Sequence, residues 1–241
     1  RATAPIVALA EDHAFPDPDW AESLIAAHEG PWAAVGPSIR NANPGSAVSR
    51  ADLLIGYGPW LDPADAREAP FLPGHNTSYK REVLLGFGER LGTMLDAETL
   101  LHWELRSQGQ RLWLEPSARI AHANFSLWRS WLPAQYHYGR LFAGLRASGM
   151  PRWLRVVYVA GSPLIPAVRL ARIWREARAR PGHRAAWSCL HALVAGLAMD
   201  GLGQMVGYAL GTGRAADRVA RYEFHRARHV RPDERRELWP A

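Results

Sequence analysis

Three side chains suited to metal binding follow directly after a short apolar run near the start of the sequence. Ile6 to Ala10 carries no charge and predicts a buried strand, and Glu11, Asp12 and His13 come next. Open α/β sheets bind ligands at the ends of their strands. Carboxylates and an imidazole at such a place suit a divalent cation such as Mg²⁺ or Mn²⁺. A solvated loop with a helix-capping acid is the competing interpretation, and these residues alone leave both open.

Two further candidates are single residues placed where they could contribute to a site. His122 follows a predicted strand and would complete a ligand set if it met Asp12 and His13 in space, although a lone histidine is more often structural. Glu98 lies near the start of a predicted helix. Acids are common there because they complement the helix dipole, so Glu98 alone is not evidence for a site and becomes a candidate only together with the other features.

A third candidate is the predicted turn Gly74-His75-Asn76. Glycine allows the backbone to approach a ligand closely. An ordinary turn would have the same composition, so this feature too is weak by itself.

The order and spacing of these features resemble the second half of an inverting glycosyltransferase of family 2, which has the GT-A fold. The acidic motif of that family corresponds to "EDHAFPDPDW", and its Gly-x-Asn loop corresponds to "PGHNTSYKREVLLGFG". The stretch that runs from its acid to a later histidine corresponds to "AETLLHWELRSQGQRLWLEPSARIAHAN". The resemblance covers roughly residues 3–125, and the blocks occur in the expected order.

This resemblance implies an activity. A family 2 enzyme moves a sugar from a nucleoside-diphosphate sugar to a hydroxyl of a glycan or lipid-linked acceptor, with inversion at the anomeric carbon. A divalent metal, Mg²⁺ or Mn²⁺, would neutralise the leaving diphosphate. The implied roles are Glu98 as general base, Asp12, His13, Glu11 and His122 around the metal, and Gly74, His75 and Asn76 at the substrate.

The sequence departs from the family pattern at three points. The third residue of the acidic motif is His13, where the family often has aspartate, and the acid pair near the base reads Ala97-Glu98. The first half of the family domain, which carries the nucleotide-binding aspartate, has no counterpart in this sequence. We therefore expect the chain to belong to a longer protein and to be inactive without that half.

The elements that must position these residues form an α/β layer, because helices alternate with short strands over residues 1–122. We expect the C-terminal part of a GT-A sheet in residues 1–130, a helical, apolar membrane-associating region in 131–213 and a basic tail in 214–241. One expected helix begins near Trp20 and is capped by Asp19, a second lies near Ser49–Tyr57, and a third starts at about Arg81. A fourth is expected over Asp96–Gln108 and is stopped by Gly109. The expected strands are Ile6–Ala10, Ala33–Val35 (closed by Gly36-Pro37), Thr77–Tyr79, Arg111–Leu114 and Ala118–Ala121, with Pro116 separating the last two.

Charge is distributed unevenly along the sequence. Residues 1–150 carry 13 Lys+Arg and 16 Asp+Glu, whereas residues 151–241 carry 16 and 7. A basic second half indicates an anionic partner, either a membrane surface or nucleic acid. Its bases interleave with apolar runs, which favours lipid, so we expect no nucleic acid partner. A non-catalytic membrane-associated scaffold or a basic nucleic-acid-binding module remains the alternative to an enzyme. The single cysteine, Cys189, fits a reducing compartment.

Two uncharged runs, Val156–Val168 and Ala186–Met199, are short for membrane spans but long for surface helices. We expect them to lie on, or dip into, the cytoplasmic face of the cell membrane, with Asp200 facing protein or headgroups. An ordinary helical subdomain is the other interpretation. The arginines expected to meet anionic lipid include Arg152, Arg155, Arg169, Arg172, Arg175 and Arg184.

Overall fold

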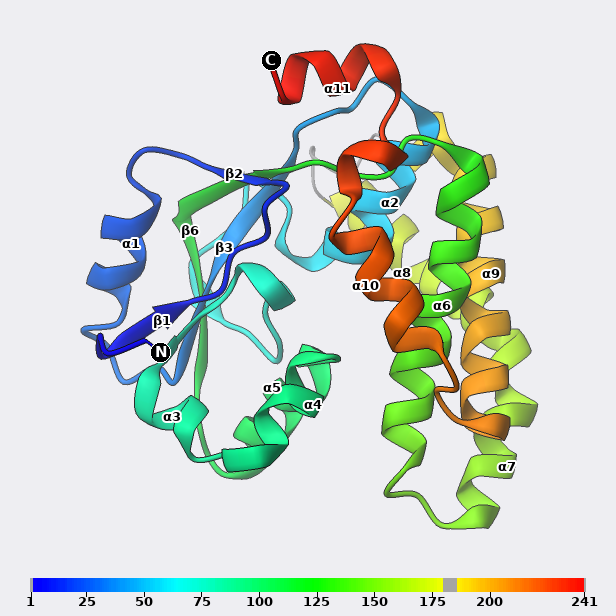
Figure 1. Ribbon diagram of the computed structural model, residues 1–241, viewed down its shortest axis with the longest axis horizontal. Helices are drawn as coiled ribbons and strands as arrows, with labels where there is room; N and C mark the ends of the chain where they lie inside the picture. Colours follow the sequence, from blue (N-terminus) through cyan, green and yellow to red (C-terminus); the bar gives the residue numbers. More distant parts are fainter. Residues whose placement is uncertain (1, 180–185, 241) are drawn as a thin grey trace. The chain divides into compact units, whose positions relative to one another are not determined.

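The computed structural model describes residues 2–179 and 186–240, and it has helices and strands in its first half and helices alone in its second (Figure 1). The fold is therefore mixed α/β followed by a helical region, as the sequence predicts. Arg184 lies outside the described residues. The strands are β1 (Ile6–Ala8), β2 (Ala14–Pro16), β3 (Ala34–Asn41), β4 (Arg67–Glu68), β5 (Ser78–Lys80) and β6 (Leu112–His122).

The helices of the first half are α1 (Trp20–Ala27), α2 (Ala47–Tyr57), α3 (Arg81–Leu85), α4 (Leu91–Leu95) and α5 (Glu98–Ser107), with the 3₁₀ turns η1 (Gly58–Trp60), η2 (Gly74–Asn76) and η3 (Gly88–Arg90). Those of the second half are α6 (Trp128–Ala147), α7 (Arg152–Gly161), η4 (Ser162–Leu164), α8 (Ile165–Ala179), α9 (Leu190–Leu210), α10 (Ala215–Glu223), η6 (Arg226–His229) and α11 (Pro232–Leu238). The elements group into two compact units: unit 1 comprises Arg1–Arg40 and Pro59–His122, and unit 2 comprises Asn41–Gly58 and Ala123–Ala241.

Unit 1 is built on one sheet with the strand order β1-β5-β3-β6-β2, and β4 also pairs with β6. β1 and β3 each run antiparallel to β5, and β2 and β4 each run antiparallel to β6. β1 is therefore an edge strand, and its residues are half-buried or exposed rather than buried as predicted. Leu24 of α1 packs on Val35 and Ala118 of the sheet and closes one small core.

Two prolines lie inside strands, whereas the sequence predicts that a strand ends at each of them. β3 continues through Pro37, and β6 continues through Pro116, so the two short strands predicted around Pro116 are one. The pairing of β3 with β5 ends at Val35, and β2 and β4 pair with β6 only on either side of Pro116. The β3–β5, β2–β6 and β4–β6 ladders therefore lose no hydrogen bond to the missing proline N–H groups.

Three helix ends differ in how they are capped, and the sequence predicts the residues at two of them, Asp19 and Gly109. The Asp19 side chain makes no capping hydrogen bond to α1, contrary to expectation. At α2 the Ser46 hydroxyl accepts the Ser49 N–H at 3.0 Å, which is an N-cap in the usual sense. The predicted end of α5 at Gly109 is confirmed, since Gly109 has a φ of 80°.

His102 fastens α5 to the rest of unit 1. Its Nδ1 accepts the N–H of Leu72 at 3.3 Å, so its Nε2 carries the proton and lies 2.8 Å from the Tyr79 hydroxyl of β5. The imidazole is fully buried, and burial lowers the pKa of His102 from 6.5 to about 3. A protonated ring could not accept from Leu72, so the fold requires the neutral form.

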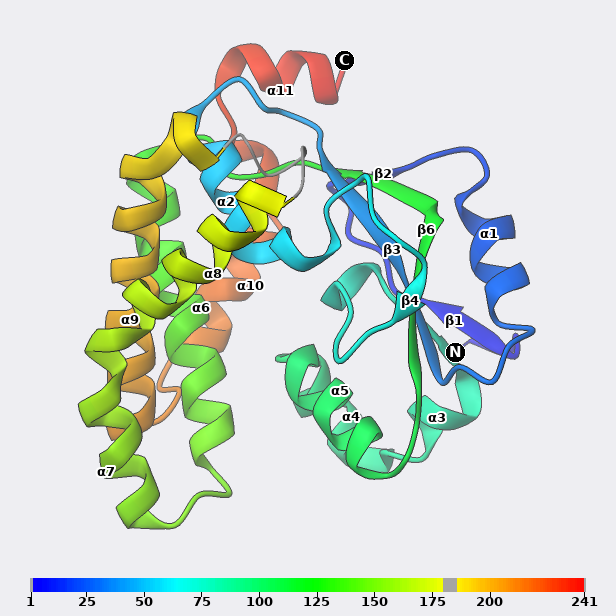
Figure 2. The same ribbon diagram turned by 180° about the vertical axis from the view of Figure 1, so that it is seen from behind.

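In unit 2, α9 packs against α6 and also against α7 and α8 (Figure 2). The α6–α9 contact is so close that a Cβ on Gly203 would overlap the carbonyl oxygen of Tyr136. Arg169 of α8 holds α9 through Asp200 at 2.6 Å, and it also donates to the carbonyl of Ile55 in α2 at 2.9 Å. Asp200 therefore faces protein, which was one of the two surroundings expected for it.

Two helical segments, Arg152–Arg178 and Ala186–Leu210, are long and apolar enough to cross a membrane by length and composition. Their surroundings differ: 50% of the apolar window of the second is buried inside the protein, against 11% for the first. The apolar composition of α9 thus serves its packing in unit 2, whereas that of α7 and α8 needs another explanation.

Loss of the buried imidazole should change how stability depends on pH. The unfolded chain protonates at His102 below about pH 6.5 and the folded chain does not, so folding stability falls as the pH drops toward 3 and is unaffected above 6.5. In His102→Gln, the difference in unfolding free energy between about pH 7 and about pH 5 should shrink by about 2 kcal/mol in urea titrations. An unchanged difference would contradict the neutral buried imidazole.

Gly203→Ala should destabilise the protein by about 1–3 kcal/mol, because the added methyl group forces the α6 and α9 backbones apart. Gly56→Ala is the matched control, since a Cβ at Gly56 of α2 meets nothing within 4 Å. It should be neutral or stabilise by up to about 1 kcal/mol. Thermal unfolding of both variants checks the pair, and equal effects would contradict the close α6–α9 packing.

Candidate functional site

The site in unit 1 forms where the chain crosses from one edge of the sheet to the other. β1 pairs with β5 and β2 pairs with β6, so residues 9–13 must pass between the two edge strands. The Leu9 N–H bonds to the Thr77 carbonyl just before β5, and Ala14 is opposite His122 in the β2–β6 register. This path brings Glu11 and His13 to the end of β6, where His122 lies.

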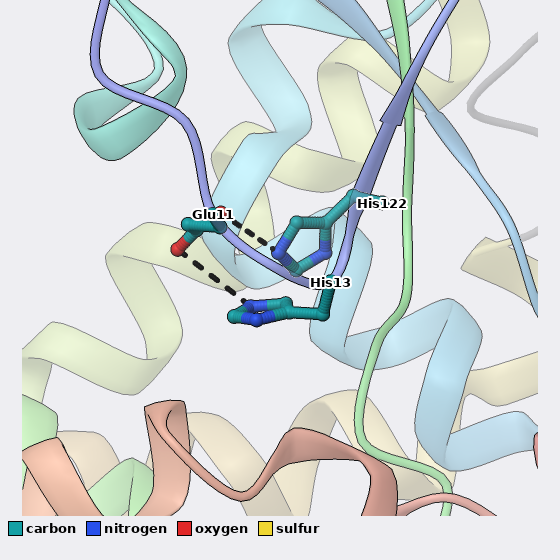
Figure 3. Close-up of side chains that lie close together, drawn as sticks. All are labelled: Glu11, His13 and His122. Carbon is teal, nitrogen blue, oxygen red and sulfur yellow. Dashed lines mark ion pairs between the residues drawn. The ribbon is translucent and has the colours of Figure 1, made fainter. Parts of the chain in front are cut away.

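Glu11, His13 and His122 converge there and form a group that could hold a metal ion (Figure 3). Glu11 Oε2 is 3.2 Å from His122 Nε2, and Glu11 Oε1 is 3.7 Å from His13 Nε2. The two imidazole rings meet edge to face, with their centroids 5.0 Å apart. One ligand atom from each residue lies within 4.8 Å of the others, so one cation could contact all three after small movements.

The charge state of the group also suits a cation. Burial alone would raise the pKa of Glu11, but the hydrogen bond and positive charge of His122, with further charge from His13 and His75, hold that pKa well below its usual value. Glu11 is therefore an anion at neutral pH. A buried carboxylate surrounded by imidazoles can exchange their protons for a metal ion without losing charge compensation.

Asp12 occupies a different place from the one that the sequence suggested. Its side chain is 74% exposed and does not join the three converging residues. Instead, Asp12 Oδ1 lies 2.9 Å from His13 Nδ1, on the far side of the ring from Glu11. A carboxylate behind a histidine ligand fixes the ring and its tautomer, so this geometry makes Asp12 an orienting residue.

The turn η2 joins this group to the residue expected to be the base. Asn76 donates from Nδ2 to Glu11 Oε2 at 2.7 Å, and the neighbouring His75 Nδ1 lies 2.5 Å from Glu98 Oε1. A Cβ on Gly74 would stand 3.0 Å from Glu98 Oε2, so this position favours glycine. Glu98 starts α5 and is buried. Two consecutive residues of one turn thus contact Glu11 and Glu98.

The comparisons with known proteins assign no family. No sequence model of a protein family matches the chain, and no curated protein matches it. The chemical interpretation therefore depends on the residues themselves.

Sequence reasoning named every member of this arrangement but not its contacts. The structure brings Glu11, His13, His122 and Asn76 together, and it pairs Glu98 with His75. The role of Asp12 behind His13 and the hold of His102 on α5 were missed. The position of Asn76, two residues before a strand that pairs with β1, is the one signal that could have predicted its contact with Glu11.

Substitution at the three converging residues should remove metal binding measured by titration calorimetry with Mn²⁺ or Co²⁺. His122→Ala should lower the affinity by more than about 100-fold, because it removes a ligand. Asp12→Asn should have a smaller effect, a loss of about 10–100-fold, because it changes only the residue that orients a ligand. His191→Ala, at an exposed histidine of α9, is the control and should bind as the unaltered protein does. Equal and complete losses in Asp12→Asn and His122→Ala would show that Asp12 is a ligand.

Proposed function

We propose that this protein is a metal-dependent inverting glycosyltransferase of the family 2 type, with the GT-A arrangement in unit 1. The observation that carries the proposal is the shared contact at one carboxylate. Glu11 of the acidic block touches Asn76 of the Gly-x-Asn block and His122 of the last block. Asn76 and His122, which lie 65 and 111 positions after Glu11 in the sequence, therefore meet at one carboxylate, as a shared reaction centre requires.

The proposed cofactor is a divalent cation held by Glu11, His13 and His122, and Asp12 orients His13. When bound, it neutralises charge on the departing diphosphate. Two imidazoles and one carboxylate suit Mn²⁺ or another transition metal better than Mg²⁺, which prefers oxygen ligands and keeps several waters. Of the two cations that the sequence suggested, the donor set therefore favours Mn²⁺.

Glu98 is the proposed general base. The acceptor hydroxyl oxygen forms a bond to the anomeric carbon while the bond from that carbon to the diphosphate oxygen breaks, and the hydroxyl proton passes to the Glu98 carboxylate. His75 holds one oxygen of that carboxylate at 2.5 Å. The small Gly74 leaves room beside the other oxygen, where an acceptor hydroxyl can approach.

The proposed substrates are a nucleoside-diphosphate sugar and a glycan or lipid-linked acceptor, and the proposed location is the cytoplasmic face of the cell membrane. The apolar helices α7 and α8 and the arginines next to them support a membrane location. The excess of arginine follows the positive-inside rule.

Metal-dependent release of nucleoside diphosphate from a panel of UDP-, GDP- and dTDP-sugars tests the activity. The assay uses the longer protein that the sequence leads us to expect, because the nucleotide-binding half is needed for turnover, and water can replace the unknown acceptor. Glu98→Gln should lower kcat by about 10²–10⁴-fold and leave nucleotide affinity nearly unchanged, since only the proton acceptor is lost. Glu104→Gln, on the same helix, removes a surface pair with Arg90 and is the matched control. Equal rates in the two variants would exclude Glu98 as the base.

A further inference from the structure

One side of the α7-η4-α8 segment carries an unbroken row of exposed apolar residues, which we call the outer stripe. Its members recur at intervals of three or four residues, so they share one helix face. No charged residue interrupts it. The members are Trp153, Val156, Val157, Ala160, Leu164, Ala167, Val168 and Ala171, and the five large ones are 57–68% exposed.

The polarity of this segment is reversed relative to a surface helix of a soluble protein, which turns its charges outward. Arg155 points inward and donates to the carbonyls of Tyr208 and Ala209 at 3.1 and 3.3 Å. Arg169 also points inward, to Asp200. The apolar side is thus the outward side, and the contacts of α7 and α8 with α9 do not cover it.

The charge at the C-terminal end of the outer stripe selects an anionic neighbour. Arg172, Arg175 and Arg178 are exposed and continue the same helical spacing. Residues 116–178 contain ten arginines and a single acid, the half-buried Glu176. A second copy of the chain would therefore bring far too little negative charge from this stretch to face these arginines, whereas anionic lipid headgroups would complement them.

The inner side of the segment limits how it can meet lipid. It packs on α9, and α9 in turn packs on α6, which carries Arg140 and Arg146. Only one side of the segment can therefore contact acyl chains. This is the geometry of an interfacial element, with apolar residues in the hydrocarbon boundary and arginines at the headgroups.

We propose that the outer stripe is a lipid-binding surface that rests on an anionic bilayer, with Arg172, Arg175 and Arg178 at the phosphates. The inference deepens the membrane location given under the proposed function, because it assigns the contact to α7-η4-α8 and not to α9. It needs neither metal nor sugar nucleotide, so it can fail while the glycosyltransferase proposal stands, and the reverse.

Flotation of the full chain with phosphatidylcholine vesicles, with and without phosphatidylglycerol, tests this surface. The protein should float with the anionic vesicles, and Val157→Glu should reduce the floated fraction at least about 10-fold because it places a charge at the hydrocarbon boundary. Ile25→Glu is the matched control: Ile25 of α1 is also a β-branched helix residue and is also 57% exposed. That variant should float as the unaltered protein does. Circular dichroism confirms that both variants are folded.

The arginines are tested separately. Replacing Arg172 and Arg175 together by glutamine should remove the preference for phosphatidylglycerol, and high salt should weaken flotation of the unaltered protein. Three results would overturn the proposal: no flotation of the unaltered protein, equal flotation of Val157→Glu and Ile25→Glu, or a dimer in sedimentation that Val157→Glu dissociates while vesicles bind neither form.

Discussion

The arrangement of the candidate site in unit 1 depends on how the charge of the Glu11 carboxylate is compensated. The carboxylate is an ion in a largely buried place, and an isolated buried charge would cost several kcal/mol. Three side chains compensate that charge: His13, which follows two residues later, Asn76 of η2 and His122 at the end of β6. The desolvation cost of burying this carboxylate, which three partners must offset, is large for a group with a purely structural role. Its donor set is the kind that a metal ion satisfies.

The base candidate is connected to this carboxylate through short, stiff links. η2 provides one residue to Glu11 and the preceding residue to Glu98, so a displacement of the turn moves both contacts. α5 is in turn fixed by His102 against Tyr79 and Leu72. A buried neutral histidine with both nitrogens engaged holds the helix that carries Glu98 in one position. Preorganisation of this kind is what proton transfer to a fixed carboxylate requires.

Much of the fold and most of the site residues could be predicted from the sequence, because apolar runs, Gly109 and the helix-favouring segments are local signals. Pro37 and Pro116 misled because whether a strand continues through a proline depends on pairing partners far away in the sequence. Asp12 misled for a similar reason: sequence shows which residues are acidic, whereas the turn before β2 decides which carboxylate points inward. The inward direction of Arg155 and Arg169 likewise depends on α9 and α2.

The central claim is that Glu11, His13 and His122 hold a metal ion that meets a diphosphate. Pulsed electron paramagnetic resonance of the Mn²⁺-loaded protein tests it most directly, because nitrogen and phosphorus nuclei near the ion each give their own couplings. The account predicts ¹⁴N couplings from two imidazoles in the binary complex and ³¹P couplings after a nucleoside diphosphate is added. A spectrum that shows Mn²⁺ ligated by water alone, unchanged by the nucleotide, would contradict it.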